Sequence, residues 1–216
     1  MKILKTILTI VVLTVISTGL YAQGFGARAG VNFQNINGKD IDGDKLENGL
    51  KIGFNAGINY EIPVGTDIYF QPGLLFSTKG TDVDREIDLF DYKLSVSYIE
   101  VPLNVVFKPL LGTGHMVLGF GPYVAYGVGG KAKADDDDHD VEFTKEVEIG
   151  DPIDVIYLKA FDAGANFIIG YEMSNMLSLQ LNAQLGLVNI YPDNYLAEDD
   201  SVWKNTGFGL SIGYRF

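Results

Sequence analysis

The sequence contains no cysteine in its 216 residues. This absence excludes disulfide bonds, thiolate catalysis, iron–sulfur clusters and cysteine-ligated zinc, as well as the lipid-bearing cysteine of a lipoprotein. Positive charge is also scarce, because 16 lysine and arginine residues stand against 28 aspartate and glutamate residues and the net charge is -12. Contacts between basic side chains and phosphate are the main sequence-independent attraction to nucleic acid, so we expect no nucleic acid partner.

Long apolar runs are missing too, apart from one near the N-terminus. Lys2 and Lys5 precede an apolar run over residues 7–16, and small residues up to Ala22 follow it. This order is typical of a secretory signal peptide, which we place at residues 1–22. A membrane anchor is the alternative, but a spanning helix needs roughly 20 apolar residues and this run is shorter. We therefore expect a mature domain over residues 23–216.

The last eleven residues, 206–216, alternate between two kinds of side chain without a fault. Successive side chains of a strand point to opposite faces of the sheet. One face of this strand is small or polar and carries Arg215, whereas the other is wholly apolar. The apolar positions are Phe208, Leu210, Ile212, Tyr214 and Phe216. Such a strand suits either a sheet over a soluble core or a barrel in lipid.

Seven more segments show the same period of two, and no useful helical periodicity appears after residue 23. They cover residues 25–34, 52–62, 68–77, 98–107, 116–129, 162–172 and 177–187. Leu94 and Val96 are out of phase with the fourth segment, so we expect a bulge near Ser97. Eight strands of about 10 to 13 residues match the length that a tilted strand needs to cross a bilayer. Strand length therefore favours a membrane barrel.

The connections between these segments are alternately short and long. The short ones are residues 63–67, 108–114 and 174–176, and the long polar ones are residues 36–50, 79–93, 131–160 and 191–205. This asymmetry is typical of an outer-membrane barrel with short periplasmic turns and long external loops. We predict an all-β fold, an eight-stranded antiparallel up-and-down transmembrane β-barrel, in which the last strand pairs with residues 24–34. A soluble lipocalin-like barrel is the alternative, and it would expose the Gly, Asn, Gln and Ser face to water.

If the apolar face meets lipid, the other face points into a lumen that side chains alone can fill. The polar residues on that face are Arg28, Asn32, Asn55, Asn59, Glu61, Gln71, Glu100, Asn104, Asp162, Asn166, Glu172, Gln180, Asn182, Gln184 and Arg215. Enclosed charges must pair or form hydrogen bonds. We expect a polar network of Arg28, Glu61, Glu100, Asn104, Asp162, Glu172 and Arg215, in which each arginine bridges one of the three glutamates. This network predicts a plugged lumen without substantial conductance, and a proton or solute path is the alternative.

The chain has two histidines, His115 and His139. A rim enzyme acting on lipid needs a catalytic base with a defined partner at the outer end of the barrel. His115 belongs to a short turn at the opposite end, and His139 lies in an acidic run without a serine nearby. The glycine-rich stretch 24–30 precedes no helix and so predicts no phosphate site. We expect neither enzyme activity nor a cofactor.

The acidic run is the most distinctive part of the long connections. It contains Asp135, Asp136, Asp137, Asp138 and Asp140. One interpretation is a solvated loop that self-repulsion keeps extended. Another is a divalent-cation site, because clustered carboxylates are the ligands that Ca²⁺ and Mg²⁺ prefer, although no EF-hand spacing is present. A third is recognition of an extracellular ligand or of a basic protein patch.

Five stretches of the sequence resemble the PorT-like outer-membrane β-barrel family of bacteria. They are GARAGVNFQNI (26–36), SYIEVPLNVVFK (97–108), GFGPYVAYGVGG (119–130), FDAGANFIIGYE (161–172) and LSIGYRF (210–216). The most specific element is YIEVPL, residues 98–103. The resemblance implies a multi-pass barrel in the outer membrane, in contact with outer-membrane lipid. It also implies insertion by the outer-membrane assembly machinery, which would read Tyr214 and Phe216 as an assembly signal.

Three functions stay open at this point. The first is a non-enzymatic barrel whose outward loops carry any specific binding. The second is an accessory component of a protein secretion or gliding machinery, because the founding member of the PorT-like family is associated with one. The third is a rim enzyme that modifies lipid.

Overall fold

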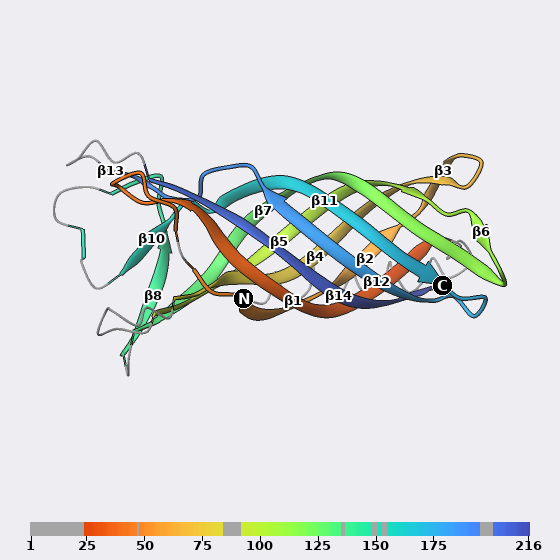
Figure 1. Cartoon of the computed structure of the whole chain (residues 1–216), viewed down its shortest axis with the longest axis horizontal. Coiled ribbons are helices and arrows are strands. Elements are labelled where there is room, and N and C mark those ends of the chain that lie inside the picture. The colour runs from red at the N-terminus through yellow and green to blue at the C-terminus, as the bar shows by residue number, and fades with distance from the viewer. Residues whose placement is uncertain are drawn as a thin grey trace, which may run out of the picture.

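Eight long antiparallel strands form a closed ring in the computed structural model, which describes residues 24–46, 48–83, 92–134, 137–147, 151–152, 155–194 and 201–216. The strands are β1 (Phe25–Lys39), β2 (Lys51–Tyr60), β4 (Ile68–Val83), β5 (Tyr92–Phe107), β7 (Gly114–Ala134), β11 (Phe161–Glu172), β12 (Leu177–Gly186) and β14 (Val202–Arg215). Each pairs with its neighbours in the chain, and β14 pairs back onto β1 (Figure 1). The predicted pairing of the last strand with the first is confirmed. The signal peptide expected over residues 1–22 lies outside the described residues.

The ring turns its apolar residues outward. In β12, Leu179 and Leu181 are 47% and 56% exposed, whereas Ser178 and Gln180 between and beside them are buried. A similar alternation runs through the other seven strands, so the outer surface is apolar, whereas the interior is largely polar but also encloses Val106, Val117 and Ile168. Closure also leaves no unpaired strand edge in the ring. Among the described residues, no helix is long and apolar enough to span a membrane.

Glycines on the inner face allow the backbones of neighbouring strands to lie very close to each other. A Cβ atom on Gly121 would lie 2.2 Å from the carbonyl oxygen of Leu103, and one on Gly164 would lie 2.1 Å from that of Leu185. Real Cβ atoms do not approach other heavy atoms this closely, so a side chain at either position would force the backbone to move.

The two ends of the ring differ. The turn end holds β3 (Ile62–Gly65), β6 (Leu110–Leu111), the turn at 173–176 and the C-terminus (Figure 1). Tight turning there puts Asp67 and Met176 at φ of 56° and 67°. The loop end holds β8 (Asp137–Phe143), β9 (Glu146–Val147), β10 (Ile156–Leu158) and β13 (Asp193–Asn194) (Figure 1).

The long connections contain much more β-structure than the sequence predicts. β7 continues to Ala134, and β8 folds back onto it with Lys131 opposite Asp140. β10 then pairs with β8 in parallel. The described part of residues 131–160 is therefore paired β-structure and not an unpaired loop, although Asp138 and Asp140 are exposed, as the solvated interpretation expects. The physical reason is that Val141 and Leu158 in this segment find a core in which to be buried.

That core closes the loop end, and we call it the loop-end cluster. Its buried members are Ile36, Leu94, Val96, Tyr98, Tyr123, Ala125, Ala132, Val141, Leu158 and Ile190. Leu46, Phe143, Ile156 and Trp203 pack against it. An apolar cap thus covers a lumen that is polar further down.

The bulge expected near Ser97 is confirmed in position. The pairing of β5 with β7 shifts between Ser97 and Tyr98, where Val128 of β7 has no partner in β5. Alternation within β5 continues through this point, so Leu94 and Val96 face inward with Tyr98. The switch in which alternate residues face inward therefore occurs in β7, at the bulge. It places residues of both β5 and β7 in the loop-end cluster.

Candidate functional site in the lumen and at the loop end

Two cations and two carboxylates lie together in the lumen near the turn end, and we call them the turn-end ion cluster. Lys108 Nζ lies 2.7 Å from Glu172 and 3.2 Å from Glu61. Arg215 also contacts both carboxylates, with Nε 3.3 Å from Glu172 Oε2 and a short contact from its terminal nitrogen to Glu61. Gln71 donates a further hydrogen bond to Glu61 at 3.0 Å. The cluster is formally neutral, as charges taken out of water require.

A second group, the loop-side ion cluster, lies directly beneath the apolar cap. Lys79 Nζ lies 2.7 Å from Glu100 Oε2 and 3.1 Å from Asp162 Oδ2. The same ammonium group sits 4.3 Å from the ring centroid of Tyr123, within range of a cation–π interaction. Tyr123 and Asn205 both donate hydrogen bonds to Asp162 Oδ2, at 3.2 and 3.0 Å. All five side chains are buried.

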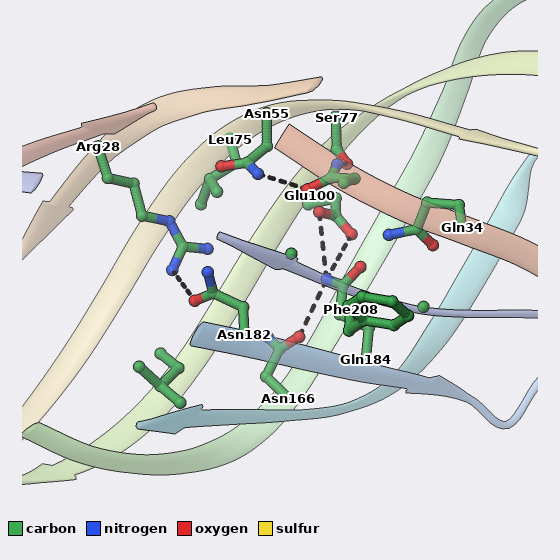
Figure 2. A pocket seen from close by; sticks show the side chains of 14 residues that line it. Arg28, Gln34, Asn55, Leu75, Ser77, Glu100, Asn166, Asn182, Gln184 and Phe208 are labelled. Carbon is green, nitrogen blue, oxygen red and sulfur yellow. Dashed lines mark hydrogen bonds between the residues drawn. The ribbon is translucent and has the colours of Figure 1, made fainter. Parts of the chain in front are cut away.

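Amide side chains fill the lumen between the two ion clusters (Figure 2). Arg28 donates to Asn182 at 3.3 Å. Figure 2 shows Gln184 between Glu100 and Asn166, to which it donates hydrogen bonds of 3.1 and 3.0 Å. The void left among these side chains measures about 20 Å³. This is the space of about one water molecule.

The residues predicted to form the lumen network all lie inside the ring. Glu100 and Asp162 meet through Lys79, and Glu61 and Glu172 meet at Arg215. Asn104 is buried, and its Oδ1 has no hydrogen-bond partner among the described residues. The expectation that Arg28 bridges a glutamate is wrong, because the structure gives Arg28 no ion pair in the part of the chain it describes. The amide of Asn182 occupies the space that the guanidinium group faces.

Sequence reasoning missed the two lysines that hold these clusters together. Residues 79 and 108 were assigned to a long loop and a short turn, yet both side chains are buried in the lumen. A usable signal was present, since Lys79 continues the inward parity of Gln71 and Ser77 in β4. Lys108 likewise lies four positions after the inward-facing Asn104, an even number that places both side chains on the same face.

The acidic candidate site has a different environment from the one expected. Asp138 lies in β8 and pairs with Lys133 at 3.2 Å and with Lys131 at 3.7 Å. The hydrogen bond from Lys133 is the main reason why the pKa of Asp138 is lowered. Asp140 lies in the same strand, whereas Asp135 and Asp136 fall outside the described residues. Within the described ranges, no three His, Cys, Asp or Glu residues group closely enough to hold a metal ion.

The terminal aromatic residues lie on the outer surface at the turn end. Tyr214 and Phe216 contact each other edge to face with 5.3 Å between ring centroids, and both are exposed. The amide of Phe216 donates to the carbonyl oxygen of Phe25 at 2.9 Å, which ties the chain end to the first strand. A hollow of about 510 Å³ opens at this end of the barrel. His115 lines it together with the four residues of the turn-end ion cluster.

A closed antiparallel ring with an apolar outside and charged and polar groups inside defines a β-barrel of the outer-membrane class. Residues 21–191 match the family model described as the outer membrane protein beta-barrel domain. The match covers well over half of the chain, so this protein belongs to that family. Its location is therefore the bacterial outer membrane.

Solved structures with a related arrangement are distant in sequence. The attachment invasion locus protein Ail of Yersinia pestis is 14% identical with a TM-score of 0.39, over 90% of this chain and 99% of that one. Ail in complex with the heparin analogue sucrose octasulfate gives 18% identity, the same TM-score and the same coverage. AlkL in DMPC bilayers gives 14% identity and a TM-score of 0.33 over 90% of each chain. No curated protein matches the sequence.

Proposed function

We propose that this protein is a non-conducting, non-enzymatic barrel that crosses the outer membrane with eight strands. We call β8, β9, β10 and β13 at the loop end the extension, and we propose that this acidic extension lies at the cell surface and binds a ligand there. One observation carries the proposal: the loop-end cluster caps the lumen, and the side chains below it leave a void of only about 20 Å³. Opening a path would expose apolar residues such as Leu94 and Leu158 and separate the ion pairs of Lys79. Both changes are costly.

The orientation follows from the asymmetry of the ends. Short turns at β3, β6 and residues 173–176 suit the periplasmic side, and the larger extension suits the outside. In this orientation a signal peptide over residues 1–22 delivers the chain, and outer-membrane lipid and the assembly machinery are its partners. The extension is then the only large part of the described protein in reach of an external ligand.

Planar bilayer recording tests the closed lumen. We expect refolded wild-type protein to give no stable channels at neutral pH. A Leu94→Ser, Leu158→Ser double variant, which weakens the apolar cap, should leave the barrel closed as well, because the ion clusters remain in place. Stable wild-type channels would overturn the proposal. The matched control is a Leu103→Ser, Val105→Ser double variant, which removes two apolar side chains from the outer face instead of the cap.

An accessory role in protein secretion is the second candidate, and it rests only on the resemblance of residues 98–103, around Glu100, to the PorT-like family. Its glutamate lies at the centre of the lumen, where it contacts Lys79 and Gln184. A deletion strain that exports its usual cargo normally would remove this candidate. A binding activity lost on shortening residues 132–158, with export unaffected, would favour the first.

A further inference from the structure

An aromatic hollow of about 240 Å³ lies at the loop end, apart from the lumen and the ion clusters. It opens between β9, β10 and the start of β14. Its lining residues are Val147, Val155, Ile156, Tyr157, Tyr191, Pro192 and Trp203. Three of the seven are aromatic, and none of these described residues carries a positive charge.

The walls of this hollow are held in place by backbone hydrogen bonds. Asn189 Oδ1 accepts the N–H groups of Tyr191 and Trp203, at 3.0 and 2.8 Å. The amide of Ile190 donates to the carbonyl oxygen of Trp203 at 2.9 Å. The Tyr191 and Trp203 rings meet at 5.0 Å between centroids with 51° between their planes. Trp203 also packs against the loop-end cluster, so the hollow rests on the core of the extension.

The segments that supply the lining are acidic. In the described part of residues 146–158 and 191–203, the charged residues are Glu146, Asp151 and Asp193. Among the lysines that flank these segments, Lys159 is paired with Asp193 at 2.7 Å. The described charges of the lining segments are therefore negative, which favours a cation over an anion at the hollow.

We propose that the hollow binds alkylammonium groups, small cations that carry methyl groups, of which choline is the simplest probe. The faces of tryptophan and tyrosine rings attract cations, and tryptophan does so most strongly. The valine, isoleucine and proline surfaces accept the methyl groups without the loss of hydrogen bonds that a bare ammonium group would suffer. A volume of about 240 Å³ is below the roughly 300 Å³ at which sites for drug-sized ligands begin, so a single head group suits it.

This inference rests on the proposed function in one respect, since the hollow must face outward to meet an external ligand. Its chemistry is testable on purified protein, where orientation and conductance play no part. A barrel that conducts ions and still binds choline would refute the closed lumen alone. A closed barrel that does not bind choline would refute the hollow alone.

Trp203 provides the readout, because it is the only tryptophan in the chain. We expect choline chloride to change its fluorescence with saturation on the order of millimolar in protein refolded in octyl glucoside. Sodium chloride at equal ionic strength should give no such change. The neutral isostere 3,3-dimethyl-1-butanol should bind about tenfold more weakly, because only the positive charge differs. Equal binding of the two compounds, or no saturable change with choline, would overturn the proposal.

A paired substitution locates the site. Tyr191→Leu removes one ring of the hollow and should weaken choline binding about tenfold. Tyr126→Leu removes an equally large ring from the outer face of β7 and should leave it unchanged. Heat-modifiable migration on SDS gels shows whether each variant is folded. If Tyr191→Leu does not fold, the comparison of choline with its isostere on the wild type still decides the question. Equal choline affinity in both folded variants would overturn the assignment.

Discussion

The ammonium group of Lys79 lies 2.7 Å from a carboxylate oxygen of Glu100, and both side chains are buried in the barrel. The pair joins the polar lumen to the apolar cap, because Lys79 also lies over the rings of Tyr98 and Tyr123, which belong to the loop-end cluster. Removal of the Lys79 charge would leave Glu100 and Asp162 buried without a cation.

Lys79→Met should destabilise the barrel strongly. The substitution keeps most of the side-chain volume but leaves Glu100 and Asp162 without their shared cation, which costs about 3–5 kcal/mol. Urea unfolding of the refolded protein measures this loss. Lys131→Met is the control, because its ion pair with Asp138 is exposed to solvent and such pairs contribute little to stability. A similar loss in both variants would contradict the structural role of the buried pair.

Leu158→Ala should loosen the extension while the ring stays folded. Leu158 is fully buried in the loop-end cluster, and truncation of such a leucine costs about 2–5 kcal/mol. We expect faster proteolytic cleavage within residues 131–160 and unchanged heat-modifiable migration of the barrel. Leu110→Ala, at an exposed position of the turn end, is the matched substitution and should leave the cleavage rate unchanged. An unchanged rate for Leu158→Ala would show that the extension does not depend on this core.

The hairpin of β7 and β8 should lose its ion pairs in acid. The pKa of Asp138 is lowered in the folded state, mainly by its hydrogen bond to Lys133. A lowered pKa stabilises the fold above the ordinary value of about 4, and this contribution disappears as the pH falls through the folded-state pKa. Lys133→Ala should raise the pKa of Asp138 toward its ordinary value in an NMR titration. A pKa that does not move would mean that the pair is not formed in solution.

Deletion of Phe216 should impair assembly more than stability. The ring is exposed on the outer face and contacts Tyr214, while the backbone amide makes one hydrogen bond to Phe25. A single hydrogen bond contributes about 0.5–1.5 kcal/mol, so refolded protein should unfold at nearly the wild-type urea concentration. The amount found in the outer membrane of cells should drop clearly. Normal insertion of the truncated chain would rule out a signal at this residue.

Much of the ring could be predicted from local pattern alone. The period of two in residues 177–187 and 206–216 identifies strands and the outward face of each, because side-chain direction in a strand depends only on position parity. The same parity places Glu61, Glu172 and Arg215 inside. The binding partner of Arg28 could not be predicted in this way, because several interior groups lie within reach of a long guanidinium side chain.

Within the eight predicted segments, the sequence by itself determined which residues face outward and which face the lumen, since this depends on neighbours only a few residues away. It did not place Lys79 and Lys108, which lie beyond the ends of those segments. Tertiary structure alone decided that Lys79 meets Asp162, 83 residues further along the chain. It also decided that an acidic segment folds into a hairpin over an apolar cap. The physical reason is that burial of Val141 and Leu158 requires surfaces from β5 and β7, and no local pattern specifies contacts between such distant segments.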